Sequence, residues 1–228
     1  MCGLSPQDCR MATLELVWDM DGTLLDSTVV VPAAFVAAVR ELGGPRVSPE
    51  EVVASYSLGT PEVILAHLVG CELTLDETEV YYRKLRDVEV APYPGVADVL
   101  DFLRERGRAV AVFTGASSRA GETLLKAAGL DVDVLIGGDH VQRPKPAGDG
   151  LFLAAKRLGV APDDLAYIGD SPLDLRAAAA AGSRSAAAMW GHLYDGAEPC
   201  DATLTRPEEA LELLAGDHND ERPAAGAV

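Results

Sequence analysis

Two carboxylates one residue apart, Asp19 and Asp21, follow an apolar stretch in the segment VWDMDGTLLDS, residues 17–27. Asp-Gly after an apolar run is a strong signal for a tight turn, since glycine accepts a positive φ and aspartate tolerates one. The same spacing suits catalysis, because residues i and i+2 of an extended segment point the same way. One carboxylate can act as a nucleophile while the second exchanges protons with a leaving group and with water. This segment alone leaves both interpretations open.

Polar residues suited to the same chemistry follow other apolar stretches. Thr114 and Gly115 end the segment RAVAVFTG, and Asp170 ends the segment LAYIGD. Lys145 lies in RPKP, shortly before a helical pattern. In an open α/β sheet, ligands bind outside the carboxyl ends of the strands. We therefore expect these residues to converge on one crevice with the two aspartates, which favours a catalytic site over a simple turn.

The clustered aspartates indicate a bound cation and phosphate chemistry. Asp19, Asp21 and Asp170 would repel one another unless a hard cation lay among them, and Mg²⁺ prefers a few oxygen ligands together with water and a substrate phosphate. Lys145 adds a positive point charge. Thr114 and nearby backbone N–H groups offer donors at a helix N-terminus. Phosphoryl transfer depends mainly on positioning and charge neutralisation, and this set of residues supplies both.

The elements that must position these residues alternate between strands and helices. The predicted strands are residues 14–19, 108–115, 132–138, 165–170 and 183–190. The predicted helices are residues 96–107, 117–130, 149–159, 173–182 and 207–216. Strands that are apolar throughout and are separated by helices indicate βαβ units in a parallel sheet covered on both faces. The expected fold is a doubly wound, Rossmann-like α/β core.

One segment, residues 28–92, breaks the alternation and contains only helical patterns. Ser48, followed by proline and two glutamates, is a favourable N-cap, and Thr60, followed by proline and glutamate, repeats the arrangement. The segment is too long for one crossover between strands, so we interpret it as an inserted α-helical cap domain. The predicted division of the rest is a core of residues 12–27 and 93–216, with disordered tails at residues 1–11 and 217–228.

The overall charge is strongly acidic, with a formal net charge of −17 at pH 7. Such a charge repels nucleic acid and anionic membranes, and an anionic substrate would need a local cation. The chain has no apolar stretch near the roughly 18–20 residues that span a bilayer. It also shows no signal-peptide pattern and no disulfide-framework spacing among its cysteines. These features predict a cytoplasmic protein without nucleic-acid or membrane partners, and they leave its oligomeric state open.

With these motifs in order, the chain resembles the haloacid dehalogenase superfamily of phosphohydrolases. The matching segments are DMDGTLLDS, VFTG, RPKP and YIGDSPLDLRAAAAAG, which span about residues 13–190. The helical insertion between the first two motifs resembles the small cap of that family. Within the family, the chain looks most like phosphoglycolate-phosphatase-like members.

The resemblance implies a role for each matching residue. Asp19 would be the nucleophile and Asp21 the general acid/base. A Mg²⁺ ion would be held by the Asp19 carboxylate, the backbone carbonyl of Asp21 and Asp170. Thr114 and Lys145 would bind the phosphoryl group.

The resemblance also implies supporting residues and shows two departures. Gly115 belongs to the predicted phosphate-binding set, although asparagine is frequent at its position, so a substrate contact could differ. Gly22, Ser171 and Asp174 would support the metal and the lysine. Trp18 stands where phenylalanine is usual.

The leading functional prediction is a Mg²⁺-dependent phosphatase that hydrolyses a small phosphorylated metabolite through an aspartyl-phosphate on Asp19. A phosphosugar mutase of the same fold is the alternative, since it differs only in whether water or a sugar hydroxyl attacks the intermediate. A non-enzymatic phosphoacceptor domain is a remote alternative, because such domains are shorter and carry adjacent acids on their first strand. Dehalogenase and phosphonate chemistry are disfavoured, because neither gives Asp21 an oxygen leaving group to protonate.

Other conspicuous residues receive weaker predictions. The segment SLGTPE, residues 57–62, is expected to contact substrate, because a cap must present a loop to the crevice. The basic cluster of Arg83, Lys84 and Arg86 is interpreted as a solvated helix face. The histidines share no ligand spacing and are assigned no role.

Overall fold

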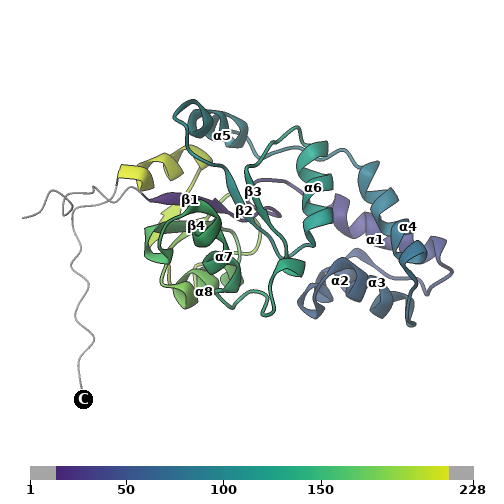
Figure 1. The fold of residues 1–228 in the computed structure, drawn as a ribbon. Helices are drawn as coiled ribbons and strands as arrows, with labels where there is room; N and C mark the ends of the chain where they lie inside the picture. Colours follow the sequence, from purple (N-terminus) through teal and green to yellow (C-terminus); the bar gives the residue numbers. More distant parts are fainter. Residues whose placement is uncertain (1–13, 216–228) are drawn as a thin grey trace, which may run out of the picture.

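The computed structural model describes residues 14–215, which form a parallel sheet with helices on both faces and a helical segment at one end (Figure 1). The six strands have the order β3-β2-β1-β4-β5-β6, and every neighbouring pair is parallel. Their bounds are β1 Glu15–Trp18, β2 Ala111–Phe113, β3 Val134–Ile136, β4 Leu165–Gly169, β5 Arg184–Ala188 and β6 Ala202–Leu204. This order confirms the doubly wound α/β fold predicted from the alternating pattern.

The sheet has a hydrophobic core on each face, which explains why its strands are apolar throughout. In β1, Trp18 packs into one core and Val17 into the other, and both side chains are fully buried. In β2, Val112 belongs to the first core while Phe113 belongs to the second. Successive residues of a strand point to opposite faces, so a strand covered on both sides needs apolar residues at every position.

Two pairs of helices cover the two faces of the sheet (Figure 1). Helices α5 (Val96–Glu105) and α6 (Ser118–Ala127) bury their apolar residues in the first core. Helices α7 (Asp149–Leu158) and α8 (Pro172–Ala181) bury theirs in the second. This arrangement leaves the carboxyl ends of the strands open for a site.

Four helices lie between β1 and α5 in the sequence and form the opposite end of the molecule in Figure 1. Their bounds are α1 Val30–Glu41, α2 Pro49–Ala54, α3 Pro61–Val69 and α4 Leu75–Arg86. Helix α1 packs against α4, where the rings of Phe35 and Tyr81 stack with centroids 4.2 Å apart. Ser48 caps α2 through a capping box, as expected. Thr60 makes no side-chain cap on α3, contrary to expectation, while Thr74 forms an unforeseen capping box on α4.

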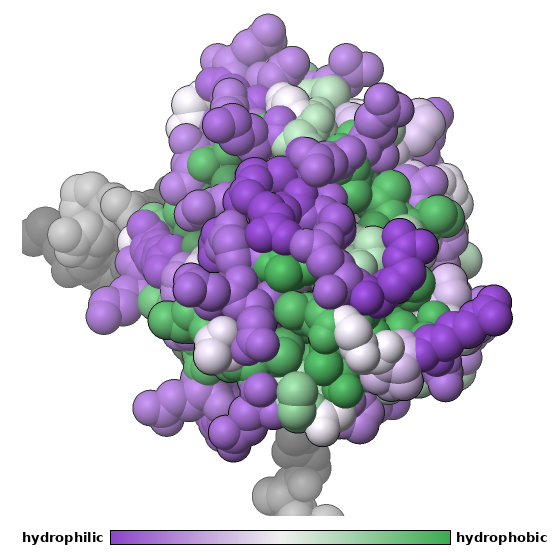
Figure 2. All heavy atoms as spheres, turned by 90° about the vertical axis from the view of Figure 1, so that its right-hand side faces the viewer, coloured by the Kyte–Doolittle hydropathy of each residue, from purple (hydrophilic) through white to green (hydrophobic). Residues whose placement is uncertain are grey.

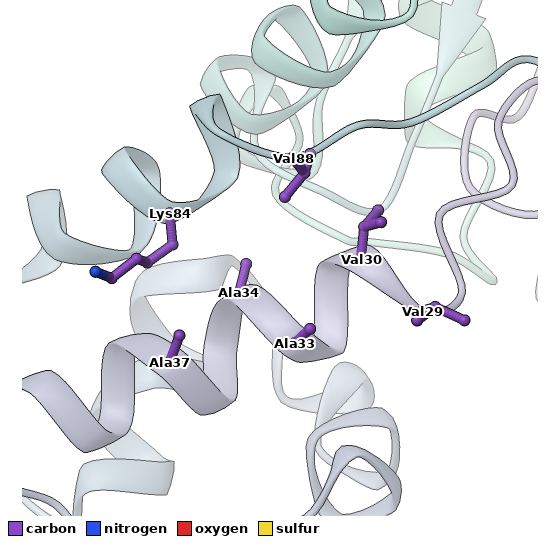
Figure 3. Close-up of a pocket in the computed structure, with 7 residues that line it drawn as sticks. All are labelled: Val29, Val30, Ala33, Ala34, Ala37, Lys84 and Val88. Carbon is purple, nitrogen blue, oxygen red and sulfur yellow. The ribbon is translucent and has the colours of Figure 1, made fainter.

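The surface of this helical end is mixed. Polar residues cover much of it, and apolar residues gather in patches between them (Figure 2). One shallow hollow lies between α1 and α4, with an aliphatic lining and Lys84 at its margin (Figure 3). Lys84 pairs with Glu41 at 2.6 Å, and Arg83 also pairs with Glu41. Arg83 and Lys84 of the basic cluster therefore form ion pairs on the outer surface of the helical segment.

The last part of the described chain differs from expectation. The predicted helix at residues 207–216 is a 3₁₀ helix, η4, at Pro207–Ala215. Strand β6 was not foreseen, because its three residues lie in a polar segment with no clear alternation. The expected tails, residues 1–11 and 217–228, lie outside the described residues. Within the described range, no helix is both long and apolar enough to cross a membrane.

Candidate active site

The segment after β1 is both a turn and the entrance to a site. The backbone N–H of Asp19 donates to the carbonyl of Ile168 at 2.8 Å, which fixes the aspartate against β4. The Met20 carbonyl then accepts from the N–H groups of Leu24 and Leu25, both at 2.9 Å. Gly22 makes the reversal with φ of +79°, a conformation that favours glycine. A Cβ atom on Gly22 would lie 2.3 Å from Asp170 Oδ2, so a close approach also demands glycine there.

A cavity of about 520 Å³ lies between the carboxyl ends of the strands and the helical segment. The predicted site residues that line it are Asp19, Asp21, Gly22, Thr114, Gly115, Lys145, Asp170 and Ser171. Asp174 is buried behind them and does not line the cavity. The structure therefore brings the whole predicted set together, with Asp174 as a supporting residue beneath the surface.

Lys145 lies between two carboxylates and donates a hydrogen bond to each. Its Nζ donates to Asp19 Oδ1 and to Asp174 Oδ1, both at 2.6 Å, and its side chain is 8% exposed. Burial alone would lower the pKa of Lys145, but the charges of Asp174 and Asp19 outweigh it and raise that pKa above its ordinary value. Lys145 therefore stays charged and faces the position where a phosphoryl group would meet Asp19.

Asp174 positions this lysine through a network of its own. Its Oδ2 accepts from the hydroxyl of Ser171 at 2.7 Å and from the Ser171 N–H at 3.0 Å, which forms the capping box of α8. Its Oδ1 accepts from Lys145 and from the hydroxyl of Tyr167 at 3.1 Å. Both oxygens are thus satisfied by protein donors, which makes Asp174 a better anchor for the lysine than a metal ligand.

The acidic cluster has the free oxygens that a hard cation needs. Asp19, Asp170 and Asp174 each place one carboxylate oxygen within 4.8 Å of the others. Asp170 Oδ2 accepts from the backbone N–H groups of His192 and Leu193, but its Oδ1 is buried without a partner among the described residues. A buried, unpaired carboxylate oxygen is costly. Oxygen ligands from Asp19 and Asp170 suit a divalent cation such as Mg²⁺.

Burial raises the pKa values of both aspartates of the first motif. For Asp19, burial is the main cause, the nearby carboxylates of Asp174 and Asp170 add to it, and Lys145 opposes it. For Asp21, burial raises the pKa while a hydrogen bond from the Ser27 hydroxyl opposes the shift. A raised pKa favours the protonated form of Asp21, which suits a general acid.

The two residues that follow β2, Thr114 and Gly115, line the cavity. The Thr114 backbone is fixed by its hydrogen bond to the Ile136 carbonyl at 2.9 Å, and its Oγ1 accepts from the Ala116 N–H at 3.1 Å. Ser117 then caps α6. Gly115 lines the cavity, and a Cβ atom added to it would meet no other atom within 4 Å. Glycine therefore leaves this part of the cavity open.

Several residues of the site were not identified from the sequence. Ser27 donates to Asp21, and the backbone of His192, rather than its ring, donates to Asp170. Tyr56 and Tyr81 line the cavity from the helical segment. No sequence motif marks these positions, because their contacts depend on how the segment folds back onto the sheet. The loop at residues 57–62 does reach the cavity, through Ser57, Gly59 and Pro61.

Comparisons with known proteins agree with this geometry. A family model described as haloacid dehalogenase-like hydrolase matches residues 16–182. The phosphoglycolate phosphatase of Escherichia coli is 32% identical, with 92% of each chain covered. The N-acetylmuramic acid 6-phosphate phosphatase of Pseudomonas aeruginosa is 29% identical, covering 90% of this chain and 96% of its own. The crystal structure of CbbY from Rhodobacter sphaeroides in complex with phosphate has a TM-score of 0.73 at 25% identity, with 89% of this chain and 99% of that chain covered.

The family match covers strands β1–β4 and the helical segment, and residues of all four motifs line one cavity. The relatives of similar length are phosphatases of small phosphorylated compounds by name. On these grounds the chain belongs to the haloacid dehalogenase-like hydrolases and is a phosphatase that resembles the phosphoglycolate phosphatases.

Proposed function

We propose that the chain is a Mg²⁺-dependent phosphomonoesterase that acts on a small phosphorylated metabolite through a phosphoryl intermediate on Asp19. The observation that carries this proposal is the buried Asp19–Lys145 pair, which shares one cavity with Asp21. The lysine neutralises charge where the nucleophile acts, and phosphoryl transfer depends above all on such positioning and neutralisation.

In the first step, an oxygen of Asp19 attacks phosphorus, and the bond between phosphorus and the ester oxygen breaks. Asp21 gives its proton to the departing oxygen, so the organic group leaves as an alcohol. In the second step, water attacks phosphorus and the bond to Asp19 breaks. Asp21, now a carboxylate, takes the proton from water, and inorganic phosphate leaves. Both aspartates return to their starting states.

The metal would be held by Asp19, by Asp170 and by the backbone carbonyl of Asp21. The unpaired Oδ1 of Asp170 supports this assignment. So does the Asp21 carbonyl, which accepts no backbone hydrogen bond in the described part of the chain. A bound Mg²⁺ ion supplies positive charge to the phosphate oxygens. Thr114 and Lys145 would orient the same oxygens from the other side.

We also propose that residues 28–92 act as a cap over a core of residues 12–27 and 93–216. The cavity supports this division, because its charged lining residues all come from the core, whereas α1–α4 contribute only uncharged side chains. A cap of this kind excludes water from the first step and admits it in the second.

The decisive experiment compares wild type, Asp19→Asn and Asp163→Asn across a panel of phosphomonoesters with Mg²⁺ present. Asp163 is an exposed carboxylate of η3 and serves as the matched control. Phosphate release is expected to fall by at least about 1,000-fold in Asp19→Asn alone. Activity that persists in Asp19→Asn would overturn the mechanism. Isomerised sugar phosphate without phosphate release would identify a mutase instead.

A further inference from the structure

The two sides of the cavity differ sharply in chemistry. The side at the strand ends carries the charged groups of the proposed phosphate site. The side formed by the helical segment is mainly aliphatic and aromatic, with Val31 and Phe35 from α1, Val53 from α2, Ile64 from α3 and Tyr81 from α4. The organic part of a substrate bound with its phosphate at Asp19 must lie against this second side.

Positive charge is scarce around that organic part. Among the described residues that line the cavity, Lys145 is the one Lys, Arg or His, and it is already bound to Asp19 and Asp174. On α4, Arg83 and Lys84 are paired with Glu41 and do not line the cavity. A carboxylate in this place would find no further cationic side chain among the described lining residues, which makes its burial costly.

Aromatic groups provide the alternative contacts. The stacked rings of Phe35 and Tyr81 border the cavity, and Tyr56 lines it nearby. Burial is the main cause that raises the pKa values of Tyr56 and Tyr81, so both phenols stay neutral. Within the described chain, neither hydroxyl hydrogen-bonds to another protein group. These rings can pack against an apolar or aromatic face while a hydroxyl donates to a neutral oxygen.

We propose that the preferred substrate is a phosphomonoester whose organic group is uncharged and presents an apolar or aromatic face, and that esters bearing a second anion, such as phosphoglycolate, are poor substrates. This inference rests on the proposed phosphatase function and adds the substrate class. The proposed substrate class differs from the one that the names of the relatives suggest, because it is inferred from the residues that line this particular cavity.

The test uses two esters of one shape, benzyl phosphate and 4-carboxybenzyl phosphate, with phosphoglycolate as a third. The value of kcat/KM for benzyl phosphate is expected to exceed those for both carboxylate esters by at least about 30-fold, since an unpaired buried carboxylate is strongly disfavoured. Equal or better turnover of either carboxylate ester overturns the substrate class while leaving the phosphatase function standing. Hydrolysis of no phosphomonoester at all overturns the phosphatase function, and the substrate class with it.

Two variants, each of which adds one lysine, test whether the lack of a cationic side chain causes the expected preference. Val53→Lys places a cation on the cavity lining, whereas Val63→Lys places one on an exposed position of α3 away from it. The two valines are similarly exposed, at 44% and 50%. Val53→Lys is expected to raise kcat/KM for 4-carboxybenzyl phosphate relative to benzyl phosphate by about 10-fold. Val63→Lys is expected to leave this ratio unchanged. An unchanged ratio in a folded Val53→Lys protein, checked by thermal melting, overturns the inference.

Discussion

The hydroxyl of Tyr82 on α4 lies 2.8 Å from the hydroxyl of Ser117, the residue that caps α6. Tyr82 also donates to Glu62 at the start of α3. Ser117 accepts from the Ala120 N–H, so its own proton is free to go to Tyr82. This chain of hydroxyls joins two helices of the proposed cap to a helix that flanks the sheet.

Tyr82→Phe is expected to loosen this junction, because it removes two hydrogen bonds and keeps the ring. The free energy of unfolding should fall by about 1–2 kcal/mol, and KM should rise more than kcat falls, since the cavity opens more often. Hydrogen exchange of residues 75–86, together with kinetics, measures both effects. Tyr194→Phe is the control, because the Tyr194 hydroxyl makes only long contacts within its own loop, 3.4 Å to the Glu198 carbonyl and 3.6 Å to Cys200 Sγ. Unaltered exchange in Tyr82→Phe would show that the hydroxyls do not hold the cap.

Asp21→Asn tests the proton donor through the leaving group. The variant cannot protonate a departing alkoxide, so turnover of alkyl phosphates is expected to fall by about 100-fold or more. The rate of the first step with 4-nitrophenyl phosphate should fall much less, because its leaving group needs no proton. Acid quenching should then trap phosphoprotein, since water attack on the intermediate also loses its base. Equal losses in the rate of phosphoprotein formation from both esters would exclude the general-acid role.

Asp170→Asn tests the proposed metal site and carries a stability prediction of defined sign. Burial first, and then the charge of Asp174, raise the pKa of Asp170, so its ionised form destabilises the metal-free protein. Metal-free wild type should therefore lose stability as the pH rises through that pKa. Asp170→Asn should escape this loss.

Added Mg²⁺ provides the second readout for Asp170→Asn. It should stabilise wild type against heat and leave the variant unmoved, with apparent Mg²⁺ affinity reduced by at least about 10-fold. Asp163→Asn should behave as wild type in both measurements. A Mg²⁺ response in Asp170→Asn that matches wild type would rule out the assigned ligand.

Gly22→Ala is expected to abolish phosphatase activity. Gly43→Ala is its matched control. The two glycines have similar φ values, +79° and +74°, so alanine costs each about 1 kcal/mol of backbone strain. Only at Gly22 would the new Cβ collide with Asp170, since nothing lies within 4 Å at Gly43. Phosphatase assays and melting curves on both variants should show a small loss of stability in each and a loss of activity in Gly22→Ala alone. Comparable activity in the two would mean that Asp170 can move aside.

The sequence by itself determined the fold class and the position of the site. Apolar strands alternating with helices can satisfy their backbones and bury both faces only as a parallel, doubly wound sheet. In such a sheet the strand ends share one edge, so Asp19, Thr114 and Asp170 had to come near one another. The capping box at Ser48 was also predictable, because it depends on residues only three positions apart.

Only the tertiary structure decided what surrounds those residues. The backbone of His192 reaches Asp170 across 22 positions of sequence, and the hydroxyl of Tyr82 reaches Ser117 across 35. The missing cap at Thr60 and the unforeseen strand β6 are likewise set by packing rather than by local pattern. The apolar, cation-poor side of the cavity follows from how four helices turn toward the sheet. Local periodicity shows which face of a helix is apolar, but only packing decides what that face meets.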